Sequence, residues 1–313
     1  MERFKQKLQA AAIPFRENEP LAAHCTFKIG GPAQLFVMPE NEQQLCSAVA
    51  LCKEQAVRYY LLGNGSNILF EDGGYRGVVV DTTALKMGIG FLENVSHPGA
   101  EPGAVYDAVI AGAGLKLSAL CKAALDSSLT GLEFAYGIPG TVGGAVYMNA
   151  GAYGGEMKDV LLSADVLTED LEVKTIPVEE LDLSYRHSIV PEKGYIVLGG
   201  KLQLKKGNEQ EIRERMAELA QQRREKQPLQ YPSAGSTFKR PEGYFAGKLI
   251  SDAGLKGKTI GGAQVSEKHA GFIVNIGGAT TKDILDLIAF CQKTVQEQFG
   301  VTLETEVKIV GER

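Results

Sequence analysis

The chain has 313 residues and a formal net charge of −5, with 33 Lys and Arg against 38 Asp and Glu. This length is close to two average domains and is enough to bury a substantial core without disulfides or metals. The acidic balance argues against broad non-specific binding to nucleic acid or anionic lipid, which needs a basic surface, although a local basic patch stays possible.

The five cysteines are scattered along the chain and form no Cys-x-x-Cys pair. An odd, scattered set predicts neither a disulfide scaffold nor a zinc ribbon, and it fits a reducing compartment best. The first 15 residues contain no apolar stretch long enough for a signal peptide. We therefore expect a cytoplasmic protein.

Strand and helix patterns alternate through the first 85 residues. The expected helices cover residues 2–11 and, with Asn41 as its cap, residues 41–55. The expected strands cover residues 34–38, 58–62 and 77–81. This alternation predicts a small α/β unit.

Strand patterns dominate the middle of the chain. Strands are expected over residues 103–114, 160–168, 172–176 and 195–204, and a helix over residues 118–127. The last three strands predict a largely antiparallel sheet. The uncharged window 134–153 is long enough to cross a bilayer. Its many glycines and few large apolar side chains predict a binding loop and a short helix instead.

The last third of the chain begins with a charged segment, residues 208–226. Ile212, Met216 and Leu219 recur there at helical spacing, which predicts an amphipathic helix. Further helices are expected over residues 244–253 and 281–299, and strands over 260–265, 271–275 and 305–310. We expect segment boundaries near residues 85 and 205.

Several common motifs are absent. No Gly-x-Gly-x-x-Gly follows a strand, so the usual dinucleotide fingerprint is missing. Gly257-Lys258-Thr259 ends like a phosphate-binding loop, but Asp252 occupies the first position where that motif requires glycine. There is no Gly-x-Ser-x-Gly elbow, and the four histidines have no metal-ligand spacing, so no metal site is expected.

Two glycine-rich loops stand out among the 37 glycines. The loop from Gly63 to Asn67 follows a strand, and its N–H groups with the Asn and Ser side chains would suit a pyrophosphate. A tight turn is the alternative for that segment alone. The loop from Gly137 to Gly144 opens a short helix, whose free N–H groups would attract an anion, unless glycine serves only close packing there. Together the two loops predict a large anionic cofactor.

Three other segments could carry chemistry. Arg186 offers a permanent cation, Ser236 offers a hydroxyl after a glycine, and Glu306 offers a carboxylate in the last expected strand. Taken singly, each has an ordinary interpretation as a solvated charge, a turn residue or a surface carboxylate. Spacing alone does not bring the three together.

In combination, these segments resemble the UDP-N-acetylenolpyruvoylglucosamine reductase (UDP-N-acetylmuramate dehydrogenase) family. The matching motifs occur in order between about residues 20 and 311: Thr26–Ala33, Leu62–Asn67, Gly131–Glu133, Gly137–Gly155, Tyr185-Arg186, Ala234–Lys239, Lys268–Asn275 and Glu304–Val307. Two departures are His24-Cys25, where Asn-Thr is usual, and Thr305, where proline is usual. The short chain resembles the compact subtype, which lacks an inserted loop with a substrate-binding tyrosine.

The resemblance implies an α+β fold, with a two-subdomain FAD-binding region of the vanillyl-alcohol-oxidase (PCMH) type and a C-terminal α+β substrate domain. By residue numbers, it implies FAD-binding subdomain 1 over 1–85, FAD-binding subdomain 2 over 86–205 and a substrate-binding domain over 206–313. FAD would be non-covalent, because the first glycine loop has no histidine for flavin attachment.

The implied reaction is the NADPH-dependent, FAD-mediated reduction of UDP-N-acetylglucosamine enolpyruvate to UDP-N-acetylmuramate in peptidoglycan precursor synthesis. Arg186 and Glu306 would stabilise the enolate-like charge, and Ser236 would give the proton. Glu306 would need to carry a proton or act through hydrogen bonds. NADPH would be the co-substrate, and no nucleic acid, membrane insertion or obligate protein partner is expected.

The resemblance also assigns the other site residues. The implied cofactor-binding residues are Gly63, Asn64, Gly65, Ser66, Asn67, Gly137, Ile138, Pro139, Gly140, Thr141, Val142, Gly143, Gly144 and Asn149. The implied substrate-binding residues are Tyr185, Lys239, Arg240, Gln264 and His269. Two alternatives stay open: another flavin oxidase of the same fold class, and a non-catalytic protein that binds a UDP-sugar or flavin.

Overall fold

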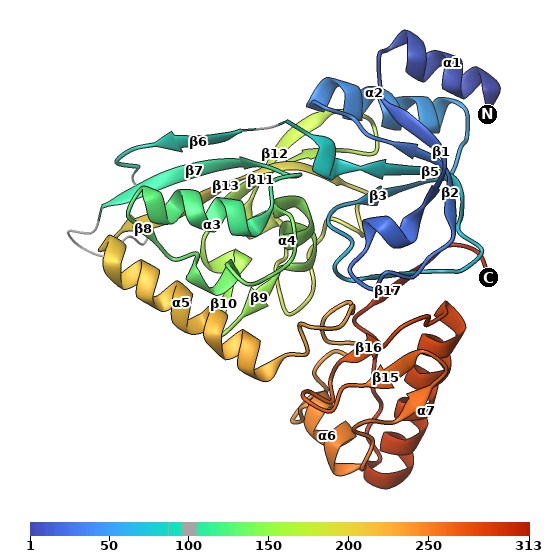
Figure 1. Cartoon of the computed structure of the whole chain (residues 1–313). Coiled ribbons are helices and arrows are strands. Elements are labelled where there is room, and N and C mark those ends of the chain that lie inside the picture. Colours follow the sequence, from blue (N-terminus) through green and yellow to red (C-terminus); the bar gives the residue numbers. More distant parts are fainter. Residues whose placement is uncertain (87, 96–104) are drawn as a thin grey trace. The chain divides into compact units, whose positions relative to one another are not determined.

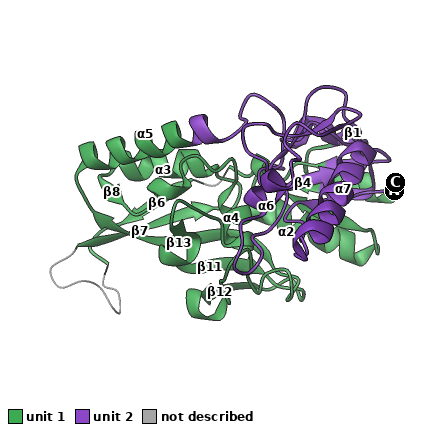
Figure 2. Ribbon diagram, turned by 90° about the horizontal axis from the view of Figure 1, so that it is seen from below, with its two compact units in different colours: residues 1–15, 37–64, 80–222 green, residues 16–36, 65–79, 223–313 purple. Residues whose placement is uncertain are grey.

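The computed structural model describes residues 1–86, 88–95 and 105–313 (Figure 1). The chain divides into two compact units, each made of three segments (Figure 2). Unit 1 contains residues 1–15, 37–64 and 80–222, and unit 2 contains residues 16–36, 65–79 and 223–313. Among the described residues, no helix has the length and apolar character needed to cross a membrane.

An antiparallel sheet forms the centre of unit 1. Its strands lie in the order β12-β11-β13-β7-β6, with β8 also paired to β13. Their bounds are β6 Ile89–Leu92, β7 Tyr106–Gly112, β8 Leu129–Thr130, β11 Leu161–Leu167, β12 Val173–Pro177 and β13 Ile196–Lys206. The predicted antiparallel sheet is confirmed. Of the expected strand 103–114, residues 103 and 104 lie outside the described residues.

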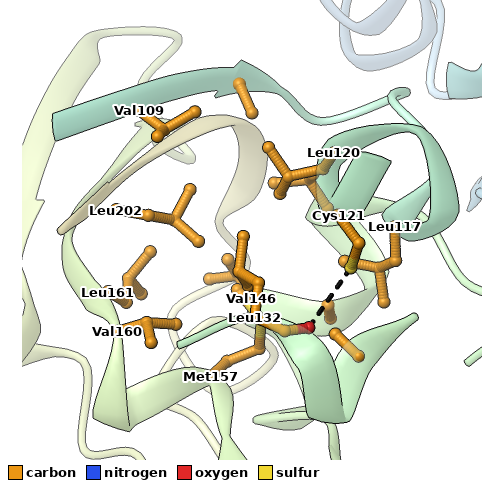
Figure 3. Close-up of a cluster of buried hydrophobic side chains, with 14 of the residues drawn as sticks. Val109, Leu117, Leu120, Cys121, Leu132, Val146, Met157, Val160, Leu161 and Leu202 are labelled. Carbon is orange, nitrogen blue, oxygen red and sulfur yellow. Dashed lines mark hydrogen bonds between the residues drawn. The ribbon is translucent and has the colours of Figure 1, made fainter. Parts of the chain in front are cut away.

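Helices α3 (Leu117–Asp126), α4 (Val142–Met148) and α5 (Glu209–Lys226) accompany this sheet in unit 1 (Figure 1). Their apolar side chains are buried in one cluster with those of the strands. Figure 3 shows part of the resulting cluster, in which Leu120 and Val146 from the helices meet Val109 and Leu202 from the strands. The Cys121 thiol donates to the Leu132 carbonyl oxygen at 3.3 Å. Each fully buried side chain of this size contributes about 1.5–3 kcal/mol, so this cluster fixes α4 and the loops at its ends.

The remaining elements of unit 1 lie outside this sheet and its three helices. They are α1 Glu2–Ala10, α2 Glu42–Glu54, β3 Tyr59–Leu62, η2 Thr82–Ala84, η3 Glu133–Ala135, β9 Gly151–Ala152, β10 Gly155–Glu156, η4 Met157–Asp159 and η5 Val178–Glu180. The Asn41 side chain accepts the Gln44 N–H at 2.9 Å and begins α2, as expected of an N-cap.

Unit 2 is built around several small sheets. Its strands and helices include β1 Phe15–Pro20, η1 Leu21–His24, β2 Pro32–Val37, β4 Ile68–Phe70, β5 Tyr75–Asp81, α6 Ala246–Asp252, β14 Thr259–Ile260, β15 Ala263–Val265, β16 Ile273–Asn275, α7 Thr281–Phe299 and β17 Lys308–Val310. Strands β14, β15 and β16 form a three-stranded sheet that contacts α7, and β17 pairs in parallel with β4. Strands β1, β2 and β5 are neighbours in another sheet. The first residue of β1, the last residue of β2 and the last two residues of β5 belong to unit 1.

Unit 2 joins early and late segments of the chain through buried and partly buried hydrogen bonds. The Thr26 hydroxyl donates to the Ser233 carbonyl oxygen at 2.6 Å, and the Thr281 hydroxyl donates to the Phe70 carbonyl oxygen at 2.7 Å. Because of such pairings the compact units cut across the expected segments 1–85, 86–205 and 206–313. That three-part division stays a prediction about the family's subdomains.

Several boundaries differ from those expected. The strand expected over residues 260–265 is two strands, β14 and β15, because Gly261 turns the chain with a φ of +52°. The last strand begins only at Lys308, so the expectation that Glu306 lies within a strand was wrong. Strands β1, β4 and β6 were not expected at all.

Candidate active site

Three sequence motifs of unit 2 meet at Thr237, whose side chain is 2% exposed. The Glu306 N–H donates to the Thr237 carbonyl oxygen at 2.8 Å, and the Thr237 N–H donates to the Gly271 carbonyl oxygen at 2.8 Å. The Thr237 hydroxyl oxygen accepts the Ile273 N–H at 3.0 Å. The segment after Ser236, the Lys268–Asn275 motif and the Glu306 segment are therefore fixed at one point.

The backbones that carry Ser236 and Glu306 run side by side. Phe238 and Thr305 form an antiparallel bridge, and the Lys239 N–H donates to the Glu304 carbonyl oxygen at 2.9 Å. Both Ser236 and Glu306 are half-buried. This arrangement can present a hydroxyl and a carboxylate to one ligand.

Asn67, from the first glycine loop, holds the same segment. Its side-chain amide donates to the Glu306 carbonyl oxygen at 3.2 Å, and its own carbonyl oxygen accepts the Lys308 N–H at 3.0 Å. These two bonds bracket Glu306 between the Thr305 bridge and strand β17. Together with the Thr237 bond, they fix the backbone at Glu306 and just after it, although Glu306 is not part of a strand.

Arg186 lies in unit 1, at the tip of a tight turn. The N–H of Ser184 donates to the His187 carbonyl oxygen at 3.2 Å, and the N–H of His187 donates to the Ser184 carbonyl oxygen at 3.1 Å. Arg186 has a φ of +56°, a left-handed conformation that costs a non-glycine residue about 1–2 kcal/mol. Its guanidinium carbon lies 5.1 Å from the centre of the Tyr185 ring, within cation–π range.

The three expected catalytic residues thus fall in two units. Ser236 and Glu306 share unit 2 and are tied to one another through Thr237, whereas Arg186 belongs to unit 1. The joint action of all three stays a prediction.

The start of the first glycine loop lies against the second loop within unit 1. The Asn64 side-chain amide donates to the Pro139 carbonyl oxygen at 2.7 Å. A Cβ atom on Gly63 would lie 2.7 Å from the Thr141 hydroxyl oxygen, closer than real Cβ contacts. Glycine is therefore needed at position 63 for close approach of the two loops.

The expectation of free N–H groups at the start of α4 needs correction. The N–H groups of Val142 and Gly143 donate at 2.9 Å to the carbonyl oxygens of Leu115 and Ala113, and the Gly144 N–H donates to the Thr141 hydroxyl oxygen at 3.4 Å. The sequence pattern does not indicate these hydrogen bonds, because the carbonyl acceptors of Val142 and Gly143 come from the turn after β7. Within the described part of the chain, the N–H groups just before the helix, those of Gly140 and Thr141, have no acceptor. They fit the donors that an FAD pyrophosphate requires.

The rest of the first loop belongs to unit 2. Gly65 has a φ of +60°, and a Cβ atom there would lie 2.2 Å from the His24 carbonyl oxygen. The Gly65 carbonyl oxygen accepts the Thr26 N–H at 3.1 Å. Glycine at this position is required by both backbone conformation and packing.

The expected substrate-binding side chains have varied surroundings. Lys239 pairs with Glu304 at 3.2 Å, and the Arg240 guanidinium carbon lies 4.8 Å from the centre of the Phe245 ring. Gln264 lies on β15 and donates to the Thr259 hydroxyl at 3.1 Å. Tyr185 is exposed beside Arg186.

His269, another member of that set, is half-buried. Burial lowers the pKa of His269 below its ordinary value of 6.5, and the nearby charge of Lys256 acts in the same direction. Its Nδ1 accepts the Gly271 N–H at 3.1 Å, so in the neutral ring the proton is on Nε2. His269 can therefore act as a neutral donor.

Comparison with known proteins identifies the cofactor. Residues 33–176 match the family model described as an FAD binding domain. The α+β architecture, with an FAD-binding region of the expected type followed by a C-terminal domain, is confirmed. The fold and the site therefore define a flavin-dependent oxidoreductase that uses FAD.

The particular family follows from the C-terminal part and from whole-chain relatives. Residues 227–310 match the model described as UDP-N-acetylenolpyruvoylglucosamine reductase, C-terminal domain. A UDP-N-acetylenolpyruvoylglucosamine reductase of Agathobacter rectalis is 54% identical over 97% of this chain and 96% of its own length. One of Clostridium perfringens is 51% identical over 94% and 92%. The chain belongs to the UDP-N-acetylenolpyruvoylglucosamine reductase family.

A solved structure agrees with this assignment. The reductase of this family from Thermus caldophilus aligns with a TM-score of 0.74 at 35% identity, covering 95% of this chain and 98% of that one. The resemblance inferred from the motifs is thereby confirmed.

Sequence reasoning missed one residue of the site, Thr237. Its signal was its place between Ser236 and Phe238 in a recognised motif. No spacing rule indicates that its hydroxyl and both of its backbone polar groups would pair with residues at 271, 273 and 306.

Proposed function

We propose that the chain reduces UDP-N-acetylglucosamine enolpyruvate to UDP-N-acetylmuramate with electrons from NADPH, within peptidoglycan precursor synthesis. The observation that carries the proposal is the convergence on Thr237, which ties the Ser236 segment to the Glu306 segment. Relatives that are 51% and 54% identical over more than nine-tenths of this chain are named for the reduction of UDP-N-acetylenolpyruvoylglucosamine. The five free cysteines accord with a cytoplasmic location.

When bound, FAD supplies the hydride that adds to the methylene carbon of the enolpyruvyl group. Ser236 then donates its hydroxyl proton to the neighbouring carbon, which carries the developing negative charge. General acids of this kind contribute about 10²–10⁴-fold to the rate. Arg186 and Glu306 stabilise the charge that spreads into the substrate carboxylate, Arg186 as a fixed cation and Glu306 through hydrogen bonds.

FAD would be held mainly by backbone. The loops Gly63–Asn67 and Gly137–Thr141 carry no charged side chain. In the second loop, the N–H groups of Gly140 and Thr141 have no acceptor among the described residues and suit a pyrophosphate. The flavin is non-covalent, because neither loop has a histidine or cysteine to attach it. Acid precipitation should leave the protein pellet colourless and the flavin in solution. A yellow pellet would contradict this.

The experiment that tests the activity is anaerobic stopped-flow spectroscopy of the purified holoprotein. NADPH should bleach the flavin absorbance, and UDP-N-acetylglucosamine enolpyruvate should restore it with formation of one lactyl ether per flavin. Reoxidation by oxygen alone, with the enolpyruvate inert, would favour a flavin oxidase. A protein that binds the UDP-sugar but consumes no NADPH would be a binding protein rather than an enzyme.

A further inference from the structure

We propose that Asn149 is a positioning residue for Arg186: its side-chain amide holds the Ser184–His187 turn and does not contact FAD. This inference rests on the proposed function, because it assigns Asn149 to the step in which Arg186 acts. It replaces the expectation from the resemblance that Asn149 binds the cofactor.

The polar atoms of Asn149 are occupied within unit 1. Its side chain is 1% exposed, and the amide nitrogen donates to Glu156 Oε2 at 2.6 Å and to the Ser184 carbonyl oxygen at 3.0 Å. The amide oxygen accepts the Lys158 N–H at 3.0 Å. Both N–H groups of the amide are therefore used, and none is left to donate to a cofactor.

One of these bonds reaches the turn that carries Arg186. The Ser184 carbonyl oxygen accepts both the His187 N–H of the turn and the Asn149 amide. A second anchor lies at the other end of the turn, where the buried Ser188 hydroxyl donates to the Tyr147 carbonyl oxygen at 2.7 Å. Tyr147 and Asn149 are both at the C-terminal end of α4, which the hydrophobic cluster fixes in unit 1.

Arg186 needs such anchors because its backbone is strained. A φ of +56° is unfavourable for arginine and persists only where the surroundings hold it. The Asn149 backbone is itself left-handed, with a φ of 42° and a ψ of 60°, and caps α4. Asparagine suits that conformation and adds a donor that glycine lacks.

The expected consequence is loss of guanidinium positioning without loss of cofactor. A displacement of about 1 Å in a charge-stabilising group can cost about 10²-fold in rate. In Asn149→Gly, which keeps the left-handed cap, we expect FAD affinity and flavin reduction by NADPH to stay within about twofold of wild type. We expect reoxidation by the enolpyruvate to slow about 10–100-fold.

A double-mutant cycle with Arg186→Ala separates positioning from a direct role. If Asn149 acts through Arg186, the double variant Asn149→Gly/Arg186→Ala should reoxidise within about twofold of Arg186→Ala alone. Asn41→Gly is the matched control: it also removes a helix-capping asparagine of unit 1, and it should leave both half-reactions unchanged. Ser188→Ala tests the second anchor. If Asn149→Gly fails to fold, the same double-mutant cycle is measured with Ser188→Ala and Arg186→Ala.

The outcomes separate this inference from the function on which it rests. Wild-type reoxidation in Arg186→Ala would remove Arg186 from the mechanism and overturn the proposed roles. Slow reoxidation in Arg186→Ala with wild-type reoxidation in Asn149→Gly would overturn only the positioning role. Weaker FAD binding in Asn149→Gly, with normal reoxidation at saturating FAD, would assign Asn149 to the cofactor and refute the inference.

Discussion

The backbone N–H of Glu306 donates a 2.8 Å hydrogen bond to the carbonyl oxygen of Thr237. Almost 70 residues separate the two in sequence, and the bond fixes a carboxylate relative to the hydroxyl of the residue before Thr237. Short backbone bonds to buried groups hold geometry better than contacts between long side chains. The relative placement of Ser236 and Glu306 is thus a property of the fold of unit 2.

Loss of the Thr237 hydroxyl should destabilise this arrangement. In Thr237→Val the buried Ile273 N–H loses its acceptor, and an unpaired buried N–H costs about 1–3 kcal/mol. Thr237→Ser keeps the acceptor and should lose less. Urea unfolding of the two variants, with equal FAD present, measures the difference. Equal stability of both variants would show that the hydroxyl contributes nothing.

Removal of the Ser236 hydroxyl should affect only one half-reaction. Ser236→Ala should keep flavin bleaching by NADPH and slow reoxidation by the enolpyruvate about 10²–10⁴-fold, because the proton donor is gone. Stopped-flow absorbance of the flavin measures both steps. Ser251→Ala, a serine in α6 of the same unit, is the control. Reoxidation at wild-type speed in Ser236→Ala would exclude Ser236 as the proton donor.

A methyl group at position 63 should separate the two glycine loops. In Gly63→Ala the new Cβ would lie 2.7 Å from the Thr141 hydroxyl oxygen, so the Thr141 side chain or one of the loops must move. We expect FAD affinity to fall at least about tenfold, the equivalent of about 1.4 kcal/mol. Fluorescence titration of apoprotein with FAD measures it.

The control for this variant is Gly90→Ala in strand β6. There the nearest atom to a new Cβ is 3.7 Å away, an ordinary contact, and FAD affinity should not change. Equal affinity in Gly63→Ala and wild type would mean that the contact between Gly63 and Thr141 has no part in cofactor binding.

The regular helices were predictable because their signals are local. Asn41 caps α2, and Thr280 with Asp283 forms a capping box at the start of α7. Strand β4 was missed because it is three residues long and pairs with β17, some 240 residues away. Glu306 was wrongly expected to lie in a strand. The sequence does not indicate that hydrogen bonds with Asn67 and Thr237 hold its backbone instead.

The site was predictable only in part, for a similar reason. The glycine loops are visible as composition, but the carbonyl acceptors that Leu115 and Ala113 offer to the N–H groups of α4 are not. The family motifs predicted Ser236 and Glu306 as site residues. The role of Thr237 depends on three tertiary hydrogen bonds, which no local pattern encodes.

His269 should make the stability of the protein sensitive to mild acid. Burial, aided by the charge of Lys256, lowers the pKa of this histidine in the folded chain below the ordinary value of 6.5. Well above pH 6.5 the ring is neutral in both states and contributes no pH dependence. As the pH falls below 6.5, the unfolded chain takes up the proton first, so the free energy of unfolding decreases.

His269→Asn removes this titration while offering an oxygen to the Gly271 N–H that His269 Nδ1 now accepts. We expect the free energy of unfolding to fall between pH 7.5 and pH 5.5 by less in the variant than in wild type. Urea unfolding at both pH values with the same excess of FAD measures it, and other titrating groups cancel in the comparison. Parallel losses of stability in the two proteins would show that His269 is not held neutral by the fold.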